Sequence, residues 1–111
     1  MIAEFSVENF FSIKSLQKIS FEPSSDTFMS DEYSREVKDG VRLLKVGIIY
    51  GANASGKTNI LNAIQFFRML VLRMPKDRNE KTRVVPFLLD DISRNETTKM
   101  SMSFYINQSK Y

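Results

Sequence analysis

The sequence predicts an α/β fold that combines a mixed β-sheet with one long helix, and three patterns support this prediction. Apolar and polar residues alternate over 2–7 and again over 100–106, as they do in half-buried strands. A continuous apolar run over 46–50 is typical of a strand buried on both faces. Apolar side chains at helical spacing over 57–73 predict an amphipathic helix in the middle of the chain.

Two short antiparallel strands are predicted at the start of the chain, over 2–7 and 17–22, with a short connection between them. Both segments alternate, so one face of the pair is apolar. The side chains that we expect to face the core are Ala3, Phe5, Val7, Ile19 and Phe21. Residues 23–40 combine a proline, several hydroxyl side chains and mixed charge, which predicts an exposed loop.

The middle of the chain predicts a strand, a turn and a helix in direct succession. The apolar run over 46–50 leads straight into Gly51, and the helix begins near Lys57. Its apolar stripe consists of Ile60, Ile64, Phe67 and Val71, widened by Leu61, Ala63 and Leu70. Pro75 cannot continue the helix and is expected to end it.

The last third of the chain predicts less regular structure before a final strand. Residues 75–83 form a charged loop, and the apolar segment 84–89 contains a proline, so an edge strand or an extended segment is expected there. A polar stretch over 90–98 then leads to the strand at 100–106. Because the chain stops where a new hairpin begins, we interpret residues 1–111 as one partial domain.

Composition excludes several kinds of site before any motif is considered. The 111 residues include no cysteine and no histidine. This excludes disulfides, Cys/His zinc sites, Cys–His nucleophile pairs and Ser-His-Asp triads. The net charge of +3 is unevenly spread, because residues 51–111 carry ten basic and five acidic side chains, whereas residues 1–50 carry six and eight. An anionic ligand is therefore expected on the second half of the chain.

A phosphate-binding motif follows the apolar run. Residues 51–58 read Gly-Ala-Asn-Ala-Ser-Gly-Lys-Thr and match the P-loop (Walker A) pattern G-x-x-x-x-G-K-[ST] at every fixed position. Gly51 and Gly56 allow a loop whose backbone N–H groups surround a phosphate, and the following helix adds its positive end. Lys57 can reach the β- and γ-phosphates, and Thr58 offers a hydroxyl to Mg²⁺. The motif therefore predicts binding of ATP, or another nucleoside triphosphate, with Mg²⁺.

The loop and the helix after it resemble those of the SMC, RecF and OLD group of ABC-type ATPases. The resemblance rests on Gly-x-Asn-x-Ser-Gly-Lys-Thr-Asn from Gly51, followed by Ile-Leu-Asn-Ala-Ile. Residues 9–14, Asn-Phe-Phe-Ser-Ile-Lys, look like the opening segment of that group. Segments 85–90 and 101–106 are similar to its bacterial AAA-type ATP-binding proteins, many of them linked to phage resistance. The resemblance implies the α/β N-terminal lobe of a P-loop NTPase, with a mixed β-sheet and a P-loop helix.

The resemblance also implies which residues bind the nucleotide. With the motif itself, the expected set is Gly51, Asn53, Ala54, Ser55, Gly56, Lys57, Thr58 and Asn59, and Thr58 is also the expected metal ligand. Members of the group usually carry a basic residue that helps to hold phosphate where this chain has Phe11. Either that contact is lost or Lys14 replaces it. The alternative for Phe10 and Phe11 is simple packing in the core.

Hydrolysis by such an ATPase needs residues that this sequence does not show. An ABC-type ATPase uses an apolar strand ending in Asp-Glu, for the Mg²⁺ shell and for water activation, and no apolar run here ends in that pair. Asp90-Asp91 comes nearest, with an exposed turn as its alternative, so the catalytic residues are unknown. The Ser-Gly-rich signature motif is absent too. We expect this chain to bind without turnover until the C-terminal lobe of the same protein and a second subunit complete the site.

The resemblance extends to partners and to the wider role. It implies a homodimer joined through the ATPase head, and a role in phage defence or DNA maintenance. A basic cluster could contact DNA or RNA, although a solvated helix end and loop is the simpler explanation; it comprises Arg68, Arg73, Lys76, Arg78, Lys81 and Arg83. The start of the chain lacks a signal-peptide pattern, and the longest apolar stretch is far too short for a membrane helix. We expect a cytoplasmic protein with no membrane partner.

Two other functions stay open. The first is a nucleotide-binding or protein-interaction module that never hydrolyses its ligand. The second is a small P-loop kinase acting on a metabolite, but such enzymes place the P-loop close to the start of the chain, whereas residues 1–50 precede it here. No acceptor-binding carboxylate and no arginine-rich lid is evident either.

Overall fold

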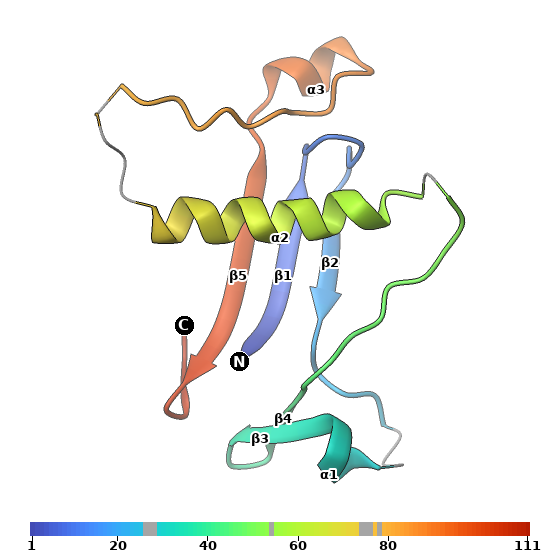
Figure 1. Ribbon diagram of the computed structural model, residues 1–111, viewed down its shortest axis with the longest axis vertical. Helices are drawn as coiled ribbons and strands as arrows, with labels where there is room; N and C mark the ends of the chain where they lie inside the picture. Colours follow the sequence, from blue (N-terminus) through green and yellow to red (C-terminus); the bar gives the residue numbers. More distant parts are fainter. Residues whose placement is uncertain (26–28, 54, 74–76, 78) are drawn as a thin grey trace. The chain divides into compact units, whose positions relative to one another are not determined.

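The computed structural model describes residues 1–25, 29–53, 55–73, 77 and 79–111 (Figure 1). The chain forms two compact units: the first comprises residues 1–6, 18–49 and 101–111, and the second comprises residues 7–17 and 50–100. Helices and strands are mixed, and the sheets are antiparallel. The mixture of helices and strands that the α/β prediction implies is therefore confirmed, but the predicted mixed β-sheet is wrong, because the sheets of the described residues are antiparallel. Alternation of apolar and polar residues indicates which face of a strand is buried and not the direction of its neighbour.

One four-stranded sheet has the order β2-β1-β5-β6. Its strands are β1 (Ile2–Glu8), β2 (Gln17–Ser20), β5 (Lys99–Ile106) and β6 (Ser109–Lys110). The Met1 ammonium donates to the Tyr105 carbonyl oxygen at 2.7 Å, and the Tyr105 N–H donates back to the Met1 carbonyl oxygen at 2.8 Å. The strands predicted at the two ends of the chain are thus confirmed, and they are neighbours in this sheet.

The core of this sheet follows the alternation in its first strand. Along β1, buried residues alternate with partly exposed ones. Ala3, Phe5 and Val7 are the buried set, each at most 2% exposed, as predicted. Ile19 and Phe21, which were expected to face inward as well, are only half-buried.

The exposed loop predicted over 23–40 is wrong for part of its length. The structure has a short helix, α1 (Ser30–Tyr33), followed by β3 (Ser34–Lys38), which pairs antiparallel with β4 (Val41–Leu44). Gly40 makes the turn with φ of 73°, and its N–H donates to the Glu36 carboxylate at 3.0 Å. The charged sequence of β3 does not show the apolar pattern from which strands are predicted. The hairpin is held instead by the hydrogen bonds between its two strands and by its turn.

The buried strand predicted over 46–50 is also wrong. None of these residues belongs to a strand, and Ile48 and Tyr50 are 83% and 90% exposed. A strand buried on both faces needs a hydrogen-bonded neighbour on each side. Within the part of the chain that the structure describes, no strand pairs with this run.

The second unit contains the long helix α2 (Lys57–Leu72), which confirms the helix predicted from residue 57. Pro75, expected to end it, lies outside the described residues. Among the helix residues only Ala63 is fully buried. A second, short helix, α3 (Asp91–Asn95), stands where a polar stretch was predicted, and residues 84–89 form no strand in the structure. No helix in the described ranges is long and apolar enough to span a membrane.

Candidate functional site

The candidate site is the loop over 51–56 together with the first turn of α2, all within the second unit. Gly56 caps the helix with φ of 89°, a left-handed conformation that other residues adopt at a cost. Gly51 has φ of 156°, which other residues rarely adopt, and a Cβ added to it would lie 3.2 Å from Ser55 Oγ, which is tighter than most such contacts. The backbone conformation of the loop therefore favours glycine at both fixed positions of the motif.

The first turn of α2 offers backbone donors to a ligand. The N–H groups of Asn59 and Ile60 both donate to the Gly56 carbonyl oxygen, at 3.0 and 3.2 Å. The N–H groups of Lys57 and Thr58 come before these first helical donors and so have no acceptor within the helix, and no side chain of the described residues caps this end. Because such N–H groups and the helix dipole together favour negative charge, this end of α2 suits an anion.

The Lys57 ammonium lies over the loop. It donates to the carbonyl oxygens of Gly51 and Ala52, at 2.7 and 2.6 Å, and lies 3.4 Å from Ser55 Oγ. An ammonium has three donors, so these three contacts use its capacity within the loop. A bound phosphate would take over part of that capacity, and the loop therefore already holds its cation where an anion would enter.

Of the other predicted site residues in the loop and at the start of α2, three are exposed and a fourth is not described. Asn53 and Ser55 are exposed in the loop, and Ala54 lies outside the described residues. Thr58 is exposed at the second position of α2, so its hydroxyl is open to a hydrated Mg²⁺ ion, which prefers oxygen ligands. The donor set therefore fits a nucleotide phosphate with its metal.

The last predicted residue, Asn59, has a partner that sequence reasoning missed. Its amide donates to Ser12 Oγ at 2.6 Å, across 47 positions of the sequence. Ser12 belongs to a tight turn in which Phe10 and Ile13 exchange two backbone hydrogen bonds of 2.8 Å. No local pattern connects this turn to the loop. The Asn-Phe-x-Ser order that supported the family resemblance is the one signal that could have identified it.

The basic replacement considered for Phe11 is not at the loop. The Lys14 ammonium forms an ion pair with Asp90 Oδ2 at 3.0 Å. Phe11 is 44% exposed, and its ring meets the ring of Phe10 edge to face, with 4.7 Å between centroids. Phe10 is buried, so the core-packing alternative is confirmed for Phe10 and wrong for Phe11.

The acidic pair Asp90-Asp91 has a structural role at α3. Asp90 caps this helix, because its Oδ1 accepts from the Ser93 N–H at 2.7 Å and its Oδ2 from the Ser93 hydroxyl at 3.0 Å. The Ser93 N–H first, and then the Lys14 ammonium, hold the pKa of Asp90 below its ordinary value of 3.8. Neither the contacts of Asp90 with Ser93 nor its ion pair with Lys14 indicates a role in activating water.

This carboxylate should make stability depend on pH. Since the pKa of Asp90 is lowered in the folded chain, its contribution is complete well above pH 3.8 and is lost as the pH falls through the lowered value. In urea unfolding measured between pH 7 and about pH 2, Asp90→Asn should flatten the acid limb of the stability curve. Asp39→Asn, which removes an exposed carboxylate from the other unit, is the control. Identical curves for Asp90→Asn and the unchanged chain would contradict the role given to this cap.

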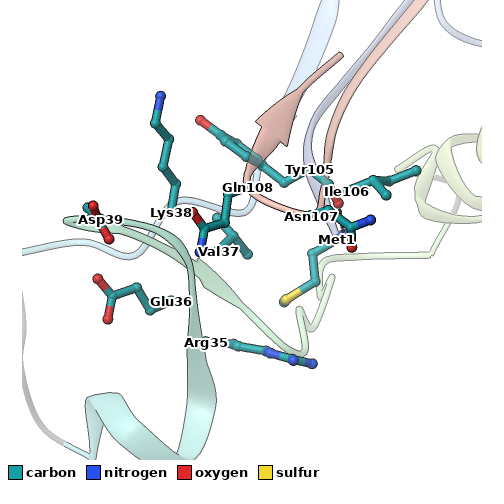
Figure 2. A pocket seen from close by; sticks show the side chains of 10 residues that line it. All are labelled: Met1, Arg35, Glu36, Val37, Lys38, Asp39, Tyr105, Ile106, Asn107 and Gln108. Atoms are coloured by element: carbon teal, nitrogen blue, oxygen red, sulfur yellow. Dashed lines mark hydrogen bonds between the residues drawn. The ribbon is translucent and has the colours of Figure 1, made fainter.

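A separate hollow of about 620 Å³ lies in the first unit. Figure 2 shows that its walls come from β3 with the turn after it, from the end of β5 with the turn to β6, and from Met1. The charged side chains that line it are Arg35, Glu36, Lys38 and Asp39. Met1 lines the hollow too, and its ammonium donates to the Tyr105 carbonyl oxygen. Because cations and anions are mixed there, the hollow does not select for an anionic ligand.

Comparison with known proteins gave a family match for the part of the chain that contains the loop. A family model described as an AAA domain, putative AbiEii toxin, of type IV toxin–antitoxin systems, matches residues 48–110. The matched range is more than half of the chain and includes every predicted nucleotide-binding residue. Searches of curated proteins and of solved structures gave no match. The family match supports a nucleotide-binding, ATPase-like function.

Proposed function

Because this chain belongs to the AbiEii-type AAA domain family of P-loop ATPases, we propose that it binds ATP with Mg²⁺ through the loop over 51–58. The observation that carries this proposal is the position of the Lys57 ammonium, hydrogen-bonded to two loop carbonyls at the N-terminal end of α2. Polyphosphate is the ligand for which a cation, a helix dipole and several backbone donors converge.

The proposed ligands are the residues that the motif and the resemblance predict. The phosphates would be held by Lys57, by the backbone of Gly51, Asn53, Ala54, Ser55 and Gly56, and by the first turn of α2, including Thr58 and Asn59. Thr58 would bind Mg²⁺ through its hydroxyl, and the metal would neutralise charge on the phosphate oxygens. ATP is the proposed nucleotide because the chain belongs to a family of P-loop ATPases.

We further propose that the chain is the N-terminal lobe of an ATPase of the SMC, RecF and OLD type, with residues 1–111 as a partial domain. The opening segment over 9–14 supports this, since its turn places the Ser12 hydroxyl 2.6 Å from the amide of Asn59. This segment lies outside the range 48–110 of the family match, so its support is separate from that match.

Hydrolysis and the wider role belong to the same proposal. We propose that a water-activating carboxylate comes from a C-terminal lobe of the same protein, and that a second copy completes the site through the ATPase head. DNA or RNA is the proposed further partner, in phage defence or DNA maintenance in the cytoplasm. The basic residues near the end of α2 support the nucleic acid as a partner; of these residues, Lys76 and Arg78 lie outside the described part of the chain.

A titration with ATP, ADP and AMP in the presence of Mg²⁺ tests the proposed binding. A P-loop surrounds the β-phosphate, so ATP and ADP should bind at least about tenfold more tightly than AMP, which lacks it. Isothermal titration calorimetry on the 111-residue chain measures the three affinities. Equal affinity for all three nucleotides would show that the phosphates are not recognised.

Phosphate release, measured on the same samples, tests the proposal that this chain binds ATP and that hydrolysis needs further elements. We expect no ATP turnover above the uncatalysed background, because the described residues supply a phosphate-binding loop and no carboxylate placed to activate water. Turnover by this chain alone would contradict the proposal that hydrolysis needs further elements.

A further inference from the structure

We propose that Ser12 is a positioning residue for the phosphate-binding loop, acting through Asn59 at the start of α2. The inference rests on the proposed function, because the loop matters only if it binds a nucleotide. Asn59 Nδ2 donates to Ser12 Oγ at 2.6 Å, between residues 47 positions apart. Among the described residues, no other side-chain hydrogen bond joins the turn over 9–13 to this loop or to the first turn of α2.

Ser12 lies against the loop as well as against the helix. A Cβ added to Gly56 would lie 3.6 Å from Ser12 Oγ, so the hydroxyl lies within van der Waals contact of the position where other residues carry a side chain. Gly56 is the residue whose carbonyl accepts from Asn59 and Ile60. Ser12 therefore faces the junction at which the loop becomes a helix.

The turn that carries Ser12 is itself firmly held. Phe10 is 1% exposed, and its ring centroid lies 5.7 Å from that of Phe66 on α2. The Phe11 N–H donates to the Val85 carbonyl oxygen at 3.0 Å. A hydroxyl on a fixed turn can hold a partner in place, whereas one on a loose loop cannot.

The consequence concerns the donors that a phosphate would use. The N–H groups of Lys57 and Thr58 lie between Gly56 and Asn59, so fixing both neighbours limits how far these donors can turn. Holding donors in place before the ligand arrives improves affinity, because less conformational freedom is lost on binding. Removing the hydroxyl should therefore weaken nucleotide binding while the fold remains.

The test compares ATP affinities of Ser12→Ala, Asn59→Ala, the double variant and Ser12→Thr in the 111-residue chain. Loss of one such hydrogen bond should weaken binding about three- to tenfold in each single alanine variant. The double variant should bind no more weakly than Asn59→Ala alone, because Ser12 acts through Asn59 and its hydroxyl has no further effect once that amide is gone. Ser12→Thr, which keeps the hydroxyl, should bind within about twofold of the unchanged chain.

Thermal unfolding without nucleotide separates positioning from general stability. Unchanged affinity in Ser12→Ala, together with lost affinity in Lys57→Ala, would overturn this inference and leave the proposed function standing. Weaker binding that Ser12→Thr does not restore, accompanied by a lower melting temperature, would also overturn it. Absence of Lys57-dependent binding in the unchanged chain would overturn the proposed function and this inference together.

Discussion

Replacing Lys57 with alanine is expected to weaken ATP binding by at least about 100-fold, the largest effect of any single change in the loop. The Lys57 ammonium already lies over the loop, 2.7 and 2.6 Å from the Gly51 and Ala52 carbonyl oxygens. Hydrogen bonds from a charged donor contribute roughly 1.5–3 kcal/mol each. Two such bonds to phosphate oxygens, at about 1.4 kcal/mol per factor of ten, account for the expected loss.

Calorimetric titration with ATP and Mg²⁺ checks this effect, and Lys38→Ala is the matched control. Lys38 is an exposed lysine of β3 in the other unit, so its loss changes the net charge equally without touching the loop. The control should bind ATP as the unchanged chain does. If Lys57→Ala kept its affinity within about threefold, the loop would not be the phosphate site.

The elements that could be predicted from the sequence are those with a strong local pattern. β1 alternates over its whole length and buries Ala3, Phe5 and Val7 as the pattern requires. α2 repeats its apolar residues at helical spacing and begins at Lys57. The loop before it could be predicted because phosphate binding requires glycine, lysine and threonine at this spacing.

The elements that could not be predicted depend on contacts between distant residues. Asp90 caps α3 and pairs with Lys14, a residue far from it in the sequence. Ser12 reaches the first turn of α2 only because its own turn is packed on that helix. The run over 46–50 has the composition of a buried strand and is exposed, because composition cannot supply a pairing partner.

Asn9 is expected to be the residue whose loss destabilises the second unit most. Its side chain is buried, donates to the carbonyl oxygens of Ser93 and Glu96 at 2.8 and 3.0 Å, and accepts from the Phe87 N–H at 2.9 Å. Asn9→Ala leaves these three backbone groups without this partner, at a cost of about 2–5 kcal/mol in the free energy of unfolding. Urea unfolding followed by circular dichroism measures this change.

Two further variants separate the hydrogen bonds from the backbone conformation. Asn9 has φ of 55°, which glycine adopts freely and alanine adopts at a cost of roughly 1–2 kcal/mol. Asn9→Gly should therefore recover about that part of the loss and no more. Asn95→Ala is the matched control, because Asn95 is exposed and its amide donates within α3, to the Asp91 carbonyl oxygen at 2.8 Å. If Asn9→Gly were as stable as the unchanged chain, the left-handed backbone rather than the buried amide would explain why asparagine occupies this position.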